Sequence, residues 1–245
     1  KRYRLALRDL NRALEMDPEN SYVYQEIGCT LIDCQKYHEA EKYFSKALSI
    51  NPLIKYSRCG MGRAMRIQKR FAQARTILQD SIRLFPEDDR SHLELGLLHL
   101  DEEHLDEARK EFLLAMKLNP HYAAPHIGLG CLYLKQSQYS MAEKEFTAAR
   151  KLEPGDGRAI LFLTFAYLKE EKTRMARRTL EELLEQKFSW KRIRQELALF
   201  YPESCWKKET YQQLRWLCDK SEKKLKKKKY TPLDKTGQNK LLFRL

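Results

Sequence analysis

The 245-residue sequence lacks most of the features that mark catalysis, membrane insertion or secretion. No stretch approaches the roughly 18 consecutive apolar residues that a membrane-spanning helix needs, and the opening KRYRLALRDL lacks the apolar block of a signal peptide. The chain has no Gly-x-Ser-x-Gly motif, no phosphate-cradling glycine loop, no dinucleotide fingerprint and no Asn-x-Ser/Thr acceptor. These absences argue against an enzyme, and we expect neither catalytic residues nor a cofactor.

Cysteine is present but is not arranged for metal binding or disulfides. There is no Cys-x-x-Cys pair, and no two thiols have the spacing that zinc sites use. The six cysteines are Cys29, Cys34, Cys59, Cys131, Cys205 and Cys218. This pattern predicts reduced, mostly buried thiols in an intracellular protein, with the cytoplasm as the expected compartment and the nucleus as the alternative.

Charge is distributed unevenly along the chain. The formal net charge is +13, but residues 1–188 contribute only +3, with 31 basic against 28 acidic residues. Residues 189–245 contribute +10, with 16 basic against 6 acidic residues. The basic character therefore belongs to the C-terminal quarter.

The most regular feature is a proline that returns every 34 residues. It occurs in the pairs Asp17-Pro18, Asn51-Pro52, Phe85-Pro86, Asn119-Pro120 and Glu153-Pro154. Three further columns keep the same period, and each holds one kind of residue. A glycine column contains Gly28, Gly62, Gly96 and Gly130; an alanine column contains Ala6, Ala40, Ala74, Ala108, Ala142 and Ala176; a large apolar column contains Leu10, Phe44, Leu78, Phe112, Phe146 and Leu180. A fixed period of this length indicates stacked structural repeats.

Within one period, the columns mark two short helices. Gly28 and Leu31 belong to one helix face, and Ala40, Phe44 and Ala47 recur at i, i+4 and i+7 on another. Proline closes each unit because it cannot continue a helix. We expect first helices at 22–34, 56–68, 90–102, 124–136 and 158–170, and second helices at 3–16, 37–50, 71–84, 105–118, 139–152 and 173–186. Small residues let the paired helices approach closely, and Phe44 is expected to fill the groove between one pair and the next.

These columns resemble the tetratricopeptide repeat family. The residues that carry the resemblance are Gly28, Leu31, Ala40, Phe44, Ala47 and Pro52 in one unit, and Leu129, Gly130, Tyr133, Ala142, Phe146, Ala149 and Pro154 in another. The tryptophan that the family places early in each unit is replaced by Tyr24, Arg58, His92 and His126. The resemblance implies an all-α fold, a right-handed superhelical solenoid of antiparallel helix pairs.

The repeat frame also gives domain boundaries. We expect an array over 1–188, a worn seventh unit or capping helices at 189–222, and a basic tail at 223–245. Trp206, Tyr211 and Trp216 are candidates for covering the last apolar face. The array divides into a half unit at 1–20, units at 21–54, 55–88, 89–122 and 123–156, and a degenerate unit at 157–190. Because the half unit has no first helix and the chain does not begin with Met, we expect the array to extend upstream.

Two clusters could suggest a metal site, and we favour a simpler interpretation of both. His92 and His126 occupy the family's aromatic packing column, and with His99 they are expected to be core or half-buried histidines. The acidic run 101–103 ends one helix and precedes another, so solvated charge and interaction with the helix dipole account for it. We therefore expect no metal.

The resemblance places a binding groove on the first helices. The positions that contact peptides in the family fall here on Tyr22, Gln25, Glu26, Cys29, Tyr56, Cys59, Gly60, Arg63, Arg66, Arg90, Leu93, Glu94, Leu97, Ala124, Ile127, Gly128, Cys131, Arg158, Leu161, Phe162 and Phe165. The alternative is that half of these merely pack between neighbouring helices. Gln25, Cys29, Gly60 and Glu94 break the set with which related domains clamp a chaperone's C-terminal carboxylate.

The groove therefore suggests a protein partner with particular chemistry. A basic middle formed by Arg63, Arg66 and Arg90 is followed by an apolar end that includes Ile127 and Phe165. Such a surface suits a protein or peptide segment with acidic residues and bulky apolar anchors. The sequence thus predicts a non-enzymatic scaffold or adaptor for protein–protein interaction.

The lysine-rich tail supports an alternative function. The basic side chains are those of Lys223, Lys224, Lys226, Lys227, Lys228 and Lys229. Such a run binds RNA or an anionic surface through counterion release, or it is simply a solvated helix end. The alternative hypothesis is therefore a repeat protein that binds RNA or another polyanion through this region.

Overall fold

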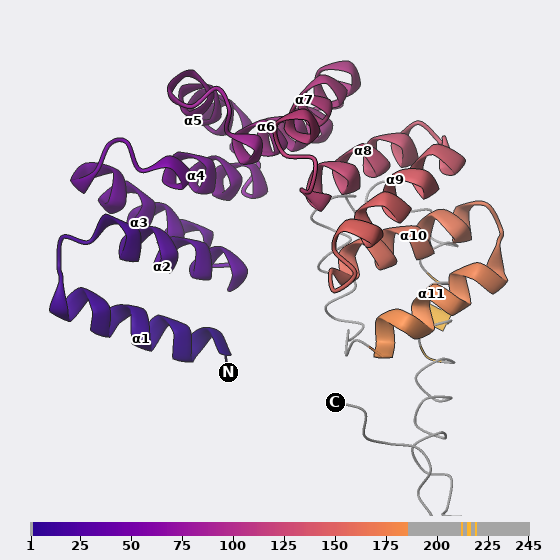
Figure 1. Cartoon of the computed structure of the whole chain (residues 1–245), viewed down its shortest axis with the longest axis horizontal. Helices are drawn as coiled ribbons and strands as arrows, with labels where there is room; N and C mark the ends of the chain where they lie inside the picture. Colours follow the sequence, from indigo (N-terminus) through magenta and orange to yellow (C-terminus); the bar gives the residue numbers. More distant parts are fainter. Residues whose placement is uncertain (1, 186–211, 213–214, 217–218, 220–245) are drawn as a thin grey trace, which may run out of the picture. The chain divides into compact units, whose positions relative to one another are not determined.

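A computed structural model describes residues 2–185 together with residues 212, 215, 216 and 219 (Figure 1). Within 2–185 the structure contains eleven α-helices and no strand. The helices are α1 (Arg2–Met16), α2 (Ser21–Asp33), α3 (Tyr37–Ile50), α4 (Lys55–Ile67), α5 (Phe71–Leu84), α6 (Asp89–Asp101), α7 (Leu105–Leu118), α8 (Ala123–Lys135), α9 (Tyr139–Leu152), α10 (Gly157–Lys169) and α11 (Thr173–Glu185). Each predicted helix is present, with ends that differ by at most one residue. No described helix is long and apolar enough to cross a bilayer.

The chain forms two compact units, residues 1–154 and residues 155–245. In the first unit α2 pairs with α3, α4 with α5, α6 with α7 and α8 with α9; in the second unit α10 pairs with α11. Along the first unit, each first helix also contacts the next one: α2 with α4, α4 with α6 and α6 with α8. No comparable contact joins α3 with α5 or α5 with α7 among the described residues. The first helices therefore form one continuous face of this unit.

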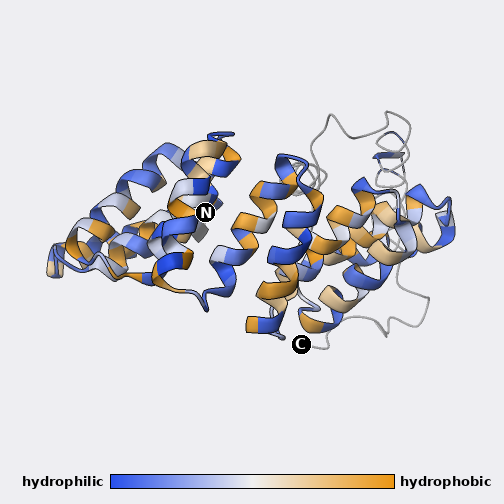
Figure 2. Ribbon diagram, turned by 90° about the horizontal axis from the view of Figure 1, so that it is seen from above, coloured by the Kyte–Doolittle hydropathy of each residue, from blue (hydrophilic) through white to orange (hydrophobic). Residues whose placement is uncertain are grey.

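Hydrophobic stripes hold the pairs together. The ribbons in Figure 2 carry hydrophobic and hydrophilic residues side by side along the helices. In α3, α5, α7 and α9 only the residues at three recurring positions are buried; in α3 these are Ala40, Phe44 and Ala47, each 0% exposed. An amphipathic helix with one apolar stripe packs that stripe inward and leaves its other side to solvent.

Phenylalanines of second helices lie between two successive first helices. A methyl group on Gly28 of α2 would come within 2.6 Å of the Phe44 ring, and one on Gly60 of α4 would come within 2.4 Å of the same ring. Phe112 has the same relation to Gly96 and Gly128. The expectation that Phe44 fills the space between pairs is confirmed. Gly60 and Gly128, which the resemblance placed in the groove, instead leave room for these rings.

The first helices end in a recurring turn that contains a residue with left-handed backbone. The residues are Gln35, Lys69, Glu103, Ser137 and Glu171, with φ between 58° and 65°. In the third of these turns the His104 N–H donates to the carbonyl of His99 at 2.9 Å, which satisfies an orphan carbonyl of α6. This position usually favours glycine, because a side chain there costs energy.

The residue before proline also stabilises its turn. Asp17 Oδ1 accepts a hydrogen bond from the Glu19 N–H at 3.3 Å, and Asn51 Oδ1 accepts one from the Leu53 N–H at 3.0 Å. Such side-chain acceptors mimic a backbone turn. The Asp-Pro and Asn-Pro pairs therefore join units through both residues.

Helix α1 has the column residues of a second helix, but they are more exposed than their equivalents in the other second helices. Ala6 is exposed, and Leu10 and Ala13 are only partly buried, whereas Ala40, Ala74 and Ala108 of the alanine column are 0% exposed. This agrees with its interpretation as a second helix packed on one side only.

The remaining boundary predictions concern residues that are mostly not described. The expected capping unit at 189–222, with Trp206 and Tyr211, and the basic tail at 223–245 lie outside the described residues. Trp216 is described, and its side chain is 54% exposed. Because most of the expected capping unit lies outside the described residues, this exposure does not test the capping role of Trp216, which stays a prediction.

Candidate functional site

The candidate binding surface is the face that α2, α4 and α6 share within residues 1–154. Tyr22, Tyr56 and Arg90 occupy one column of the repeat, one on each of these helices. The Arg90 guanidinium lies over the Tyr56 ring, 4.3 Å from its centroid, and Lys55 Nζ lies 5.3 Å from it. Tyr56 and Arg90, which are successive members of this column, therefore lie side by side.

Six of the predicted groove residues in the first unit are accessible to solvent. Tyr22 is 66% exposed, and Glu26 and Arg90 are also exposed. Cys29, Tyr56 and Arg63 are partly buried. Gly60 is partly buried and has no side chain to offer a ligand, and the remaining predicted groove residues of the block 1–154 are buried: Gln25, Cys59, Arg66, Leu93, Glu94, Leu97, Ala124, Ile127, Gly128 and Cys131. The accessible part is thus confined to α2, α4 and the first turn of α6.

Arg66 does not present its charge to a ligand. Its side chain is 5% exposed, its Nε donates to Glu94 Oε2 at 3.2 Å, and its Nη1 donates to Asp101 Oδ2 at 2.7 Å. Burial opposes the charge, but the two carboxylates outweigh it and raise the pKa of Arg66. The predicted basic middle is corrected to Arg63 and Arg90, because a buried charge is stable only when paired.

Arg63 and Arg90 differ in how far their charges are neutralised. Arg63 Nε lies 3.7 Å from Glu94 Oε1, and its side chain is 39% exposed. Arg90 makes no ion pair among the residues that the structure describes, and its contact is with the Tyr56 ring. Arg90 is therefore the arginine of this face with the most accessible positive charge.

The predicted apolar end is not an open surface. Ile127 of α8 is 0% exposed, as are Leu161 and Phe162 of α10, and Phe165 is 1% exposed. Arg158, at the start of α10, is partly buried and pairs with Asp156, its Nη2 lying 2.6 Å from Oδ2. These helices carry apolar or small side chains around most of their circumference, so their predicted groove positions are core.

The cysteines of the described part are free thiols, and three of them are held protonated by burial. Cys29, Cys34, Cys59 and Cys131 are free thiols, as expected. Burial raises the pKa of Cys59 and of Cys131, and it raises the pKa of Cys29 to about 11, so these groups stay protonated at neutral pH. A protonated thiol is a poor nucleophile.

His92 and His126 are held by matching carboxylates. His92 Nδ1 lies 2.7 Å from Glu111 Oε2, and His126 Nδ1 lies 2.8 Å from Glu145 Oε2. Both pairs join a first helix to its own second helix with the same spacing of 19 residues. The packing role expected for these two histidines is confirmed.

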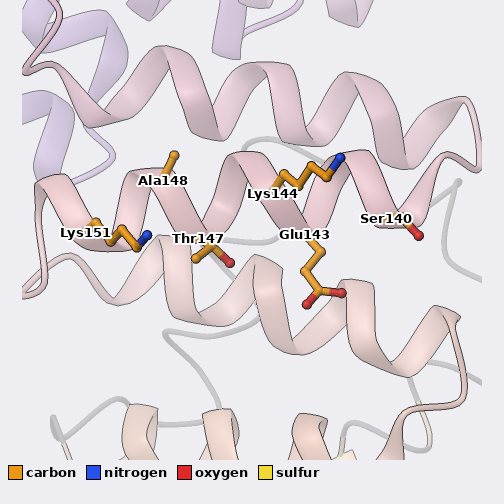
Figure 3. Close-up of a pocket in the computed structure, with 6 residues that line it drawn as sticks. All are labelled: Ser140, Glu143, Lys144, Thr147, Ala148 and Lys151. Atoms are coloured by element: carbon orange, nitrogen blue, oxygen red, sulfur yellow. The ribbon is translucent and has the colours of Figure 1, made fainter.

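A surface pocket of the first unit has described lining residues from α9 alone (Figure 3). Its lining combines lysine, carboxylate and hydroxyl groups along one side of that helix: Ser140, Glu143, Lys144, Thr147, Ala148 and Lys151. These side chains project from a single helix and do not include a histidine or a thiol. They do not assemble a nucleophile with its base.

The lysine-rich segment, Lys223 through Lys229, lies outside the described residues. Polyanion binding through the tail therefore stays a prediction.

Comparison with known proteins identifies the repeats. Residues 21–52 and residues 59–123 match family models described as tetratricopeptide repeat. No curated protein sequence matches the chain.

Solved structures share the fold at low sequence identity. TTC0263, a thermophilic TPR protein of Thermus thermophilus, is similar with a TM-score of 0.66 and 19% identity over 73% of this chain and 98% of its own. A chain of the APC/C hetero-tetramer Cut9-Hcn1 has a TM-score of 0.63 and 19% identity over 85% of this chain. Yeast Tom70 has a TM-score of 0.62 and 22% identity over 89% of this chain. The match spans 45% of the length of each of the last two proteins.

These identities show the fold and not a shared partner or activity. The two matched repeat segments, the consecutive helix pairs and the shared fold show that the chain is a tetratricopeptide repeat protein, an all-α solenoid of the kind that serves as a scaffold for protein–protein interaction.

Proposed function

We propose that the chain is a non-enzymatic adaptor that binds an extended segment of a partner protein across the accessible surface of α2, α4 and α6. We name this surface the first-helix face and define it by Tyr22, Glu26, Tyr56, Arg63 and Arg90. The observation that carries the proposal is the stack of Arg90 on Tyr56, which leaves an exposed cation above an aromatic ring. Arginine and tyrosine are the residue types that most often dominate binding energy at interfaces.

The floor beneath this face supports the proposal because it is rigid. Ser57 Oγ donates to Gln25 Oε1 at 3.3 Å and so links α4 to α2, and the Arg66–Glu94 pair links α4 to α6. Buried polar links of this kind fix the spacing of the three helices before any ligand arrives. A preorganised surface loses less conformational entropy on binding.

The charges of the face indicate the chemistry of the partner. Arg90 and Arg63 favour an acidic residue, and the exposed ring of Tyr22 offers an apolar surface for a bulky side chain. The partner segment is therefore acidic with at least one large apolar anchor. The reduced thiols favour a cytoplasmic or nuclear setting for this interaction.

The proposal can be tested by selecting peptides against the chain and measuring their affinity. Phage-displayed random peptides selected on the wild-type chain are expected to be enriched in Asp or Glu near Leu, Phe or Trp. For a selected peptide, fluorescence anisotropy should show Arg90→Ala and Tyr22→Ala each weakening binding about 10-fold or more, the size typical of central interface residues.

A matched control uses Arg83 of α5, an exposed arginine that pairs with Asp80 on a second helix. Arg83→Ala should leave the affinity unchanged within about 2-fold, since it is not part of the face. Selected peptides that bind Arg90→Ala and Tyr22→Ala as tightly as the wild type would show that the binding surface lies elsewhere.

A further inference from the structure

The turn between α6 and α7 brings together three side chains that can bind a metal ion. They are His99 in the last turn of α6, Glu102 directly after that helix, and His104 directly before α7. One ligand atom from each lies within 4.8 Å of the other two, and the two imidazole rings have centroids 6.0 Å apart. Imidazole and carboxylate are both ordinary ligands of zinc.

The backbone of the turn fixes this arrangement. The His104 N–H donates to the His99 carbonyl at 2.9 Å, and Glu103 between the ligands has a left-handed φ of 65°. The hydrogen bond closes a short loop, so the Cα atoms of the two histidines cannot separate without breaking it. The ligand set is therefore held by the end of a helix rather than by a free loop.

The same turn elsewhere in the repeat shows that these three positions converge. The equivalent residues after α10 are Tyr167, Glu170 and Lys172. There Lys172 Nζ lies 2.8 Å from Glu170 Oε2 and 5.8 Å from the centroid of the Tyr167 ring. The repeat geometry therefore allows side chains at these three positions to meet.

Among the five turns that the structure describes, only the third combines three metal-ligating residues at these positions. The corresponding sets in the other turns are Leu31, Cys34 and Lys36; Met65, Gln68 and Arg70; Tyr133, Gln136 and Gln138; and Tyr167, Glu170 and Lys172. The third turn departs from this pattern by having His99, Glu102 and His104. Its composition is not required by the fold.

One buried nitrogen atom of the cluster has no hydrogen-bond partner among the described residues. His99 Nδ1 is buried and makes no hydrogen bond within the described residues. A buried polar nitrogen without a partner is costly, and a bound ion is one way to satisfy it. Glu102 is engaged by Arg75 of α5, whose guanidinium forms an ion pair with it and therefore competes with a metal ion for this carboxylate.

We propose that His99, Glu102 and His104 form a binding site for one divalent transition-metal ion, of which Zn²⁺ is the representative. Three protein ligands leave a fourth tetrahedral position for water. Ligand atoms around zinc are about 3.3 Å apart when each bond is about 2.0 Å long, so a small closure of the cluster is needed. His104 is exposed and can rotate to provide it.

The test is a zinc titration of the full chain, kept reduced, by competition with a chromophoric zinc indicator. The wild-type chain is expected to contain one saturable site that both His104→Ala and Glu102→Gln weaken about 10-fold or more. His104 is exposed and Glu102→Gln keeps the size of its side chain, so the fold, checked by circular dichroism, should persist. Arg75→Met removes the competing cation and is expected to tighten zinc binding.

Two controls separate this site from binding by other residues. His121→Ala removes an exposed histidine from a different turn and should leave zinc affinity unchanged. Co²⁺ in place of Zn²⁺ should give a visible spectrum without the thiolate-to-cobalt charge-transfer band that bound cysteines would produce. The proposal is overturned if the wild type shows no saturable site, or if its affinity survives both His104→Ala and Glu102→Gln.

Discussion

The contact of Phe44 with Gly60 predicts a specific energetic coupling between neighbouring repeats. In Gly60→Ala the new methyl group would lie 2.4 Å from the Phe44 ring, which is far closer than atoms can approach. Overpacking of this kind costs about 1–3 kcal/mol, and replacing glycine by alanine in a helix returns about 1 kcal/mol. We therefore expect Gly60→Ala to lower the free energy of unfolding by about 0–2 kcal/mol.

Shortening the ring should relieve that clash. Phe44→Leu alone leaves a cavity and should cost about 1–3 kcal/mol, because Phe44 is 0% exposed. In the double variant the alanine methyl occupies part of the space that the ring vacates. The two changes should therefore cost less together than the sum of the single changes, with a coupling of about 1–3 kcal/mol.

Urea denaturation followed by circular dichroism measures all four corners of this cycle. Gly155→Ala is the control, because a methyl group there meets no atom within 4 Å, and it should change stability by no more than about 0.5 kcal/mol. If Gly60→Ala and Phe44→Leu are additive within about 0.5 kcal/mol, the ring does not transmit packing strain to the next repeat and the reasoning is refuted.

Three further predictions concern single positions. Burial opposes protonation of His92. Its hydrogen bonds with the Glu111 carboxylate and with a backbone carbonyl outweigh this effect, so the pKa of His92 is raised. The resulting stabilisation is complete below about pH 6.5 and is lost as pH rises through the higher pKa of the folded state. Over this rise in pH, the melting temperature of His92→Gln should therefore fall less than that of the wild type. Lys69 has φ 61°, so Lys69→Gly should raise the free energy of unfolding in urea by up to about 1 kcal/mol, whereas Lys69→Val should lower it. Arg66→Met leaves the buried Glu94 with only its longer contact to Arg63 and should cost up to about 3–5 kcal/mol in the same assay, and adding Glu94→Gln should recover part of this loss.

The sequence was sufficient to predict the helices and their pairing. A 34-residue period, proline at each joint and small residues at fixed columns place every helix within one residue of its observed ends. These features are local, and they repeat often enough that chance cannot imitate them. The position of Phe44 between two pairs also follows from the columns, since a large residue must fill the space that small residues create.

The accessible surface was harder to predict because it depends on contacts between helices. Arg66 was expected to belong to the basic middle of an open groove, but Glu94 and Asp101 of α6 pair with it and bury it. Gly60 resembled a groove position, and only the ring of Phe44 reveals its packing role. Nothing in the sequence indicated the left-handed backbone at Gln35, because glycine, the usual marker, is absent there.

The placement of Phe44 and Phe112 also changes where one repeat ends and the next begins. Proline marks the sequence boundary, yet each ring is covered only when the first helix of the following unit is in place. A fragment cut after α3 would expose the side of Phe44 that faces Gly60, whereas one cut after α4 would cover it. Stable fragments of this chain should therefore end with a first helix and contain an odd number of helices when they begin at α2.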